Sequence, residues 1–185
     1  MDLDTTDENL MRRYAKGETD TFEVLYERHK GGVYRYFLRQ CNDESIAQEL
    51  FQDVWLKVIN SRKRYQPTAK FSTWLYTLAH HRLVDWYRRQ KIRFAVDGVV
   101  DDIEDHAAGD EGLPENELQR ARLVEALKAA MCELPPEQLE VFVLHQERGF
   151  SVAEIAEIAG LGKEATKSRY RYAVRKLRNA LEVVR

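Results

Sequence analysis

The chain has 185 residues, of which 44% are hydrophobic and 32% are charged, and this composition allows one or two packed domains. Its net charge of −2 excludes a uniformly basic coat protein for nucleic acid. Its two cysteines, Cys41 and Cys132, lie far apart without a CxxC pair, so we expect buried thiols in a reducing compartment instead of a disulfide or a zinc site. The first residues lack a signal-peptide pattern and no apolar run is long enough to cross a membrane, which predicts a cytoplasmic protein without membrane insertion.

The first two helices are predicted from a capping pattern and from apolar spacing. Thr5 and Glu8 form a capping box, which starts a helix that runs to Lys16. A second helix is expected over 20–40, where apolar residues recur at helical spacing. The glycine pair at 31–32 weakens its middle by about 1 kcal/mol per glycine relative to alanine. The pattern therefore allows either a kink at this point or two shorter helices.

The third and fourth helices have the strongest patterns in the first half of the chain. Asp43 caps the third helix, and its apolar stripe consists of Ile46, Ala47, Leu50, Phe51, Val54, Trp55, Val58 and Ile59. A loop is predicted over 61–68, and the fourth helix over 72–90. Trp74 and Trp86 of that helix are expected in the core, while aromatic residues beside cations on the same helix suit single-stranded nucleic acid, because bases stack on rings and cations follow phosphates.

An acidic stretch separates the two halves of the chain. It contains no Lys or Arg, and its acidic residues are Asp97, Asp101, Asp102, Glu104, Asp105, Asp110, Glu111, Glu115 and Glu117. We interpret 95–114 as a flexible acidic linker between a helical domain at 1–94 and a second helical domain at 115–185. Because no strand alternation appears anywhere, the predicted fold class is all-α, with two small helical domains joined by this linker.

The last third of the chain has the pattern of a helix-turn-helix preceded by two helices, which are predicted over 115–132 and 137–147. Ser151 and Glu154 form a capping box, and Gly160 ends the short helix that follows. The next helix is rich in cations, namely Lys163, Lys167, Arg169, Arg171, Arg175, Lys176 and Arg178. Its apolar side is expected at Ala165, Tyr172, Val174 and Leu177.

A basic helix after a tight turn suits duplex DNA. Such a helix fits the major groove, its first turns reach base edges, and flanking cations hold phosphates. A basic helix face is more often only solvated, but here the cap, the turn and the charge bias coincide, which favours DNA binding. The candidate DNA contacts are Lys163, Thr166, Lys167, Ser168, Arg169 and Arg171.

Several stretches together resemble the extracytoplasmic-function (ECF) group of bacterial sigma factors. They are 22–29 (FEVLYERH), 47–57 (AQELFQDVWLK), 71–79 (FSTWLYTLA), 134–138 (LPPEQ), 151–156 (SVAEIA) and 166–169 (TKSR). Each motif is weak by itself, but all occur in the family's order around an acidic linker. The resemblance covers nearly the whole chain, from about residue 22 to residue 181.

The resemblance implies a sigma-two helical bundle that docks on the beta-prime clamp of core RNA polymerase, and a sigma-four helix-turn-helix that binds the beta flap. Sigma-four would read the minus-thirty-five element as duplex, and sigma-two would capture bases of the minus-ten element from separated strands. The linker would lie near the RNA exit channel. The resemblance also implies an anti-sigma factor as a partner, and neither a cofactor nor a metal.

Carried onto this sequence, the resemblance assigns residues to each contact. The polymerase-docking residues are Gln48, Glu49, Gln52, Asp53 and Lys57. The minus-ten residues are Lys70, Phe71, Thr73, His80, His81, Arg88 and Arg89. The minus-thirty-five residues are the six candidate DNA contacts named above. Members of the family often have Arg-Asn where this chain has His80-His81, which leaves the base preference at the minus-ten element open.

Two other functions compete with a sigma factor that directs promoter-specific transcription initiation. One is a stand-alone helix-turn-helix regulator that binds duplex DNA without polymerase. It would need a ligand or dimer domain in the first ninety residues, where the sequence instead has a basic aromatic helix.

The second competing function is that of an enzyme with a metal cluster at His80, His81 and Asp85. However, His80 and His81 point about 100° apart on a helix, and no further ligand motif follows. We therefore do not expect an enzyme.

Overall fold

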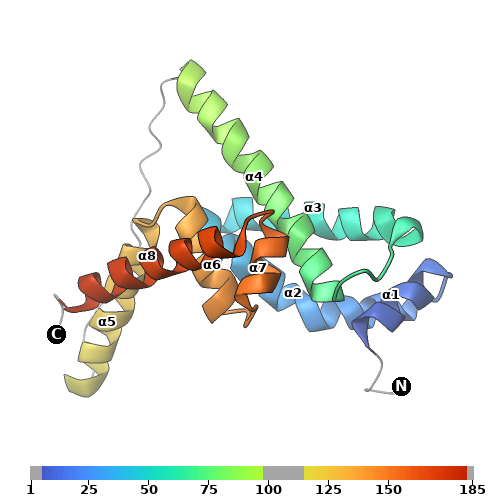
Figure 1. The fold of residues 1–185 in the computed structure, drawn as a ribbon, viewed down its shortest axis with the longest axis horizontal. Coiled ribbons are helices and arrows are strands. Elements are labelled where there is room, and N and C mark those ends of the chain that lie inside the picture. The colour runs from blue at the N-terminus through green and yellow to red at the C-terminus, as the bar shows by residue number, and fades with distance from the viewer. Residues whose placement is uncertain (1–5, 98–114, 183–185) are drawn as a thin grey trace.

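The computed structural model describes residues 6–97 and 115–182, and every regular element in these residues is a helix (Figure 1). In chain order they are α1 (Asp7–Ala15), α2 (Asp20–Cys41), α3 (Glu44–Ser61), the 3-10 helix η1 (Arg62–Arg64), α4 (Phe71–Asp97), α5 (Glu115–Cys132), α6 (Pro136–Gln146), α7 (Val152–Ile158) and α8 (Lys163–Glu182). The predicted all-α fold class is confirmed. The predicted linker lies outside the described residues except for 95–97, which continue α4.

The N-terminal unit consists of α1, α2, α3 and the first half of α4, packed around one apolar core. The stripe predicted on α3 is confirmed, because Ala47, Leu50, Phe51, Val54, Trp55 and Val58 are buried. Ile46 and Ile59 at its margins are half-buried. Trp74 and Trp86 are also half-buried and pack against this core at its edge, so they are less enclosed than predicted.

The helix α2 is continuous through its two glycines, so the kink or break allowed by the sequence does not occur. It ends at Asn42, whose φ of 50° is the left-handed conformation that terminates helices. A glycine costs helix stability in isolation, but packing on several sides offsets that cost here, since α2 contacts α1, α3, α4 and α6.

The two cysteines differ in exposure. Cys41 at the end of α2 is half-buried, whereas Cys132 at the end of α5 is exposed, which corrects the expectation that both thiols are buried.

The capping box predicted for α1 is wrong. The N-cap of α1 is Thr6, whose hydroxyl oxygen accepts a hydrogen bond from the Asn9 backbone N–H at 3.4 Å. Thr5 lies outside the described residues. Glu8 accepts a hydrogen bond at 2.6 Å from the Phe71 backbone N–H. It thereby caps α4, a helix that begins more than sixty residues later in the chain.

The C-terminal unit consists of α5 to α8, with the short helix α7 and the long helix α8 forming the predicted helix-turn-helix. The capping box at the start of α7 is confirmed, because Ser151 and Glu154 exchange backbone and side-chain hydrogen bonds. Gly160 follows α7 with a φ of 62°, which glycine adopts without strain. The main packing partners of α8 are α5 and α6.

The buried side of α8 agrees with the prediction at Leu177 but differs from it at other positions. Thr166, Ala173 and Leu177 are buried, which is a spacing of seven and four residues and therefore a single helix face. Ala165 is exposed and Tyr172 is 48% exposed, although both were predicted on the apolar side. Each lies one residue before a buried position, or about 100° around the helix. Packing against α5 and α6, and not side-chain polarity, sets the buried face.

The two units are in direct contact. In Figure 1 α4 crosses the molecule, and α7 lies beside the first half of α4. The second half of α4 extends beyond the other helices. The principal contacts between the units are those of α4 with α7 and of α2 with α6. The helix that was predicted to read separated strands therefore lies against the first helix of the helix-turn-helix.

Candidate nucleic-acid and polymerase interfaces

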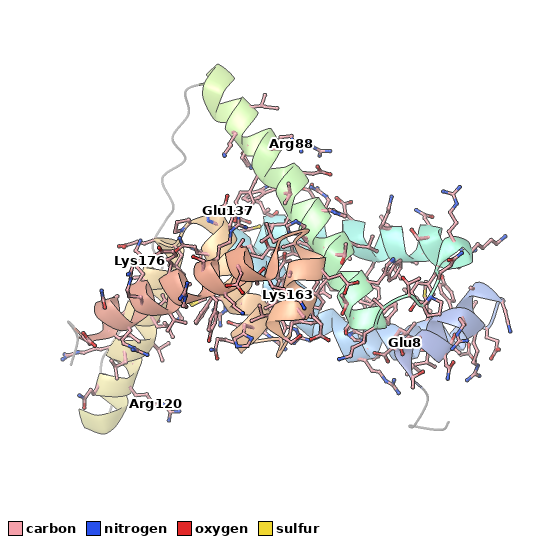
Figure 2. The ribbon with its side chains drawn as sticks, in the orientation of Figure 1. Glu8, Arg88, Arg120, Glu137, Lys163 and Lys176 are labelled. Carbon is pink, nitrogen blue, oxygen red and sulfur yellow. The ribbon has the colours of Figure 1, made fainter. Side chains whose placement is uncertain are left out.

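The start of α8 presents a row of cations to solvent. Lys163, Lys167 and Arg171 are exposed and four residues apart, so they lie on one face of the helix. Ser168 and Arg169 follow Lys167 in the chain and are half-buried, and Arg169 lies about 200° around the helix from Lys167. This arrangement can hold a polyanion along the helix, and Figure 2 shows Lys163 at its beginning.

Thr166 does not belong to that exposed row. Its side chain is fully buried, and its hydroxyl donates a hydrogen bond to the Gly162 carbonyl at 3.1 Å. It therefore fixes the first turn of α8 against the other helices and is not available to DNA in this arrangement. The sequence analysis named Tyr172 and Arg175 but did not predict their contact, in which the Arg175 guanidinium lies 4.8 Å from the centre of the Tyr172 ring. An aromatic residue three positions before a cation on a helix was the available signal.

The residues predicted for the minus-ten element divide into exposed and buried groups. His81, Arg88 and Arg89 are exposed along α4, and Figure 2 shows Arg88 on the part that extends from the molecule. Phe71 is fully buried and Thr73 is 2% exposed, so both belong to the core of the N-terminal unit and not to a nucleic-acid surface. A buried first turn is reasonable here, because it anchors the helix that presents the other residues.

Lys70 and His80 are held by carboxylates of the C-terminal unit. The Lys70 ammonium lies 2.8 Å from a carboxylate oxygen of Glu154, and a ring nitrogen of His80 lies 2.8 Å from a carboxylate oxygen of Glu140. The Lys70 side chain is nevertheless 73% exposed, whereas that of His80 is 14% exposed. The hydrogen bond from Lys70, with those from Ser151, lowers the pKa of Glu154 to about 2.

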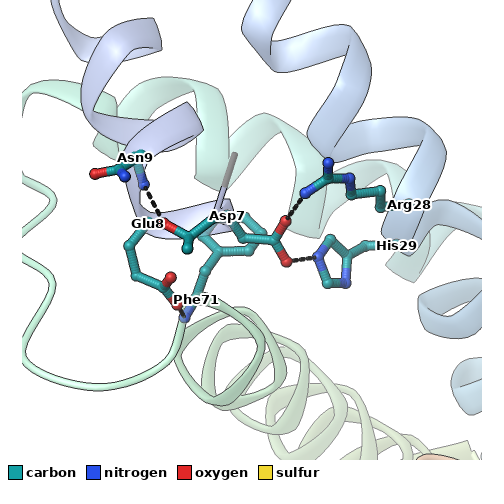
Figure 3. Close-up of polar contacts among 7 residues, drawn as sticks. Asp7, Glu8, Asn9, Arg28, His29 and Phe71 are labelled. Atoms are coloured by element: carbon teal, nitrogen blue, oxygen red, sulfur yellow. Dashed lines mark hydrogen bonds and ion pairs between the residues drawn. The ribbon is translucent and has the colours of Figure 1, made fainter. Parts of the chain in front are cut away.

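A cluster of polar contacts at the start of α1 fixes the beginning of α4 (Figure 3). Besides the bond from Glu8 to Phe71, the Asp7 carboxylate accepts from Arg28 at 2.7 Å and lies 2.6 Å from a ring nitrogen of the buried His29. Burial alone would raise the pKa of Asp7, but the hydrogen bonds from His29 and Arg28 outweigh it and hold the pKa below its usual value. The sequence analysis missed this cluster, because the only signal was the Glu8 pattern that it assigned to α1.

The predicted polymerase-docking residues lie on the outer face of α3. Gln48, Glu49, Gln52 and Lys57 are exposed, and Asp53 is half-buried. A shallow hollow of about 250 Å³ adjoins them and is lined by Tyr26, Lys30, Gly31, Tyr34, Gln48 and Phe51. The face thus combines separated charges with an apolar depression, which is a composition found in protein–protein contacts.

Arg82 connects this docking face to α4. Its Nε donates to Asp53 at 2.6 Å and its Nη2 donates to Glu49 at 2.9 Å, while only 15% of its side chain is exposed. Two of the predicted docking residues are therefore also partners of the helix predicted to read the minus-ten element. Nothing in the sequence indicated this link, because it depends on how α3 and α4 cross.

The histidine pair does not form part of a metal cluster within the described residues. His80 and His81 have ring centres 5.7 Å apart, and no group of three or more His, Cys, Asp or Glu side chains there is arranged to hold a metal ion. Among the helices of the described ranges, none has the length and apolar character needed to span a membrane.

Comparison with known proteins places these two units in sequence families. Residues 25–92 match the family model of Sigma-70 region 2, and residues 130–179 match that of Sigma-70 region 4. The chain is 32% identical over 173 residues to the RNA polymerase sigma factor CarQ of Myxococcus xanthus, covering 92% of this chain and 95% of that protein. It is also 32% identical over 185 residues to the ECF RNA polymerase sigma factor SigK of Mycobacterium sp. (strain KMS), covering 96% and 92%.

Solved structures have the same fold at lower identity. The sigma factor RpoE of Bartonella quintana, in complex with the anti-sigma factor NepR, has a TM-score of 0.72 at 21% identity, over 89% of this chain and 98% of that chain. CnrH, in complex with the cytosolic domain of CnrY, has a TM-score of 0.69 at 22% identity, over 97% and 99%. The two family matches in chain order and the relatives at 32% identity favour a sigma factor over a stand-alone regulator, and the chain belongs to the ECF sigma factors, a family of transcription initiation factors.

Proposed function

We propose that this protein binds core RNA polymerase through α3 and directs it to promoters, with α8 on duplex DNA at the minus-thirty-five element and α4 on separated strands at the minus-ten element. In this proposal the two functional domains are 1–94 and 115–185. The protein would act in the cytoplasm. The observation on which it depends most is the exposed cation row of α8, placed by a capped helix-turn-helix within a chain of this family.

The docking face is the part of the N-terminal unit best suited to a protein partner. Its charges alternate in sign between Asp53 and Lys57, and the neighbouring hollow could receive an apolar side chain. Leu56, which is 56% exposed on the same helix, adds apolar surface that a partner could cover. We assign the clamp of the beta-prime subunit to this face on the family's pattern.

The two DNA-reading faces differ in what they offer. On α8 the cations of Lys163, Lys167 and Arg171 would neutralise phosphates. We keep Arg169 as a candidate base contact on the family's pattern, although it is half-buried and lies about 200° around the helix from Lys167. On α4 the exposed cations stand beside half-buried rings, with Trp86 and Tyr87 having centres 4.9 Å apart. Rings beside cations suit unstacked bases, which is the form in which a melted minus-ten element is presented.

An anti-sigma factor is the further partner that we propose. The structures of RpoE and CnrH were each solved with another protein bound, NepR and the cytosolic domain of CnrY. By analogy, this chain would be held inactive until such a partner is removed.

In vitro transcription with bacterial core RNA polymerase and a library of random promoters tests the proposed function. We expect transcripts from selected start sites that depend on adding this protein. A lack of start-site selection on every template, together with tight sequence-specific binding of the isolated protein to duplex DNA, would favour a stand-alone regulator.

A further inference from the structure

Arg169, the candidate base contact kept on the family's pattern, lies toward the buried side of α8. At about 100° per residue it lies within about 80° of each of the three buried residues, Thr166, Ala173 and Leu177. It is also half-buried. A side chain on this side of the helix would have to turn around α8 to meet a base.

Arg175 lies on the opposite side of the same helix. It is exposed, and it lies about 160–180° around the helix from each of those three buried residues. Arg171 is four residues earlier and therefore shares its face. A recognition helix turns its outer face toward the major groove, because its inner face packs against the rest of the domain. Arg175 thus stands at the centre of the face that α8 would present to a duplex.

The side chain of Arg175 extends back toward the start of α8. Long side chains on a helix cover the turn before their own Cα atom, and the Arg175 guanidinium accordingly lies over the ring of Tyr172, three residues earlier. Residue 172 is nine residues after Lys163, which is about 14 Å along the helix axis. This length is comparable to the width of the major groove, about 12 Å, so the guanidinium stays within reach of base edges when α8 lies in the groove.

Tyr172 holds the guanidinium without consuming its hydrogen-bond donors. The ring is 48% exposed, and its centre lies 4.8 Å from the guanidinium carbon. A cation–π contact of this kind uses none of the five N–H donors of arginine. The residues three and four positions from Arg175 on the helix are Arg171, Tyr172, Arg178 and Asn179, so no carboxylate of a neighbouring turn competes for those donors. The pair therefore presents an oriented guanidinium whose donors can serve a ligand.

The adjacent cation is held in a different way. The Lys176 ammonium donates to the Glu133 backbone carbonyl at 2.6 Å and lies 3.6 Å from the carboxylate of the same residue. Lys176 is thus tied to the residue that follows α5. A hollow of about 410 Å³ between α8 and the start of α6 is lined by both cations and by Tyr172, so the space beside the pair is open. Two neighbouring cations therefore have different roles, one toward the protein and one toward a ligand.

We propose that Arg175 is a specificity-determining residue that reads a guanine of the minus-thirty-five element, and that Tyr172 is its positioning residue. Guanine presents its N7 and O6 acceptors side by side in the major groove, and two N–H groups of one guanidinium match them. The inference rests on the proposed function, since it takes α8 as a helix that binds duplex DNA.

The chain offers matched variants for this pair. Arg175→Lys keeps the charge but loses the two-pronged geometry, and Arg175→Ala loses both. Tyr172→Phe keeps a ring beneath the guanidinium, whereas Tyr172→Leu removes the ring and keeps an apolar residue with high helix propensity. Lys176→Ala removes the adjacent cation and is the control for charge. All these side chains are exposed, so each variant should keep the helix content of the wild type, as measured by circular dichroism.

Selection from duplexes with random base pairs across the minus-thirty-five region measures the reading. It is performed with the holoenzyme and with the free full-length protein. The wild type should prefer G·C at one base pair, and Arg175→Ala and Arg175→Lys should each reduce that preference by at least about fivefold while preferences at the other base pairs remain. Tyr172→Leu should reduce it less, and Tyr172→Phe and Lys176→Ala should keep it.

A contact with phosphate alone would give a different result. Arg175→Ala would then weaken all duplexes equally and lower the slope of log affinity against log salt by about one, while Arg175→Lys would resemble the wild type. Either of these outcomes would overturn the reading role. Equal effects of Tyr172→Phe and Tyr172→Leu would overturn the positioning role of the ring.

Transcription with core RNA polymerase separates this inference from the proposed function. If the wild-type holoenzyme selects start sites but both Arg175 variants keep every base preference, the inference fails and the proposed function stands. If the free protein selects a duplex through Arg175 but gives no selective transcripts with polymerase, the proposed function fails and the inference stands. A wild type that selects no duplex in either form overturns both.

Discussion

The two faces proposed to read DNA are presented in different states. On α8 the cations of Lys163, Lys167 and Arg171 are exposed to solvent, and Lys167 pairs with Glu164 of the same helix. Lys70, immediately before α4, and His80 of α4 are paired with carboxylates of the other unit. The cation row of α8 is made by one helix and its turn, whereas the pairing of Lys70 and His80 depends on the contact between the two units.

This difference concerns two proposed binding events, namely phosphate binding at α8 and nucleic-acid binding at α4. A face that is always exposed can bind phosphates at any time, with an affinity that falls as salt rises. On the α4 side, a phosphate would have to compete with Glu154 for Lys70 and with Glu140 for His80, although the Lys70 side chain is 73% exposed.

Removing the cation row of α8 is expected to have the largest effect. Replacement of Lys163, Lys167 and Arg171 by alanine should abolish stimulation of transcription by the minus-thirty-five element. It should also reduce the slope of log affinity against log salt by about three, because each lost phosphate contact reduces it by about one. Filter binding of the holoenzyme to promoter DNA at several salt concentrations measures this.

The control for that triple variant is Arg178→Ala, which removes an exposed cation near the other end of α8. It should leave both the salt slope and the response to the minus-thirty-five element nearly unchanged. Equal losses in the control and in the triple variant would mean that only net charge matters and that α8 has no reading face.

Docking variants are expected to have the next largest effect and to differ from one another. Lys57→Ala removes an exposed cation and should weaken binding to core polymerase without changing the stability of the fold. Asp53→Ala should do both, because it also leaves the mostly buried Arg82 without its partner at 2.6 Å. Affinity for core enzyme and urea unfolding, measured on both variants, should separate the two roles. An unchanged unfolding midpoint for Asp53→Ala would contradict the role given to Arg82.

Loss of the cap on α4 is expected to have a moderate effect on stability. Glu8→Ala leaves the Phe71 N–H without its acceptor and should lower the free energy of unfolding by about 1 kcal/mol. Glu8→Gln is the matched variant, since its amide oxygen can still accept this bond, and it should lose less. Urea titrations followed by circular dichroism measure both, and equal losses would show that charge and not capping is responsible.

The pH dependence of stability that arises from Asp7, in the polar cluster at the start of α1, is the smallest expected effect. The pKa of Asp7 is lower in the folded protein than its ordinary value of 3.8, so its ionised form stabilises the fold above that value. This contribution should decrease as the pH falls below 3.8 and through the lowered pKa of the folded state. The stability difference between wild type and Asp7→Asn should therefore shrink as the pH falls from 5 to 3, as measured by urea unfolding. A difference that grows at low pH would reverse the assigned direction.

Features that depend on a few neighbouring residues were predictable from the sequence. The apolar stripe of α3 repeats at helical spacing, so it identified both the helix and its buried side. The capping box of Ser151 and the left-handed turn at Gly160 lie within four residues of the helix ends that they define. These local patterns gave the all-α fold and the helix-turn-helix without reference to the rest of the chain.

Features that depend on contacts between distant segments were not predictable from the sequence. Phe71, Thr73 and Thr166 had residue types and positions suited to DNA, but packing buries all three. Glu8 had the spacing of a local cap, yet it caps a helix sixty-three residues away. In each case the residue has two chemically reasonable uses, and only the position of a distant helix decides between them.

The amino-acid sequence by itself therefore determined the helices, their order and the cation-rich stretch of α8, because helix periodicity, caps and charge are local properties of the chain. The tertiary structure alone decided which of those cations are exposed and which partner holds Lys70 and His80. Burial and hydrogen bonding depend on side chains that meet in space, such as His80 and Glu140, which are sixty residues apart in the chain and 2.8 Å apart in the fold.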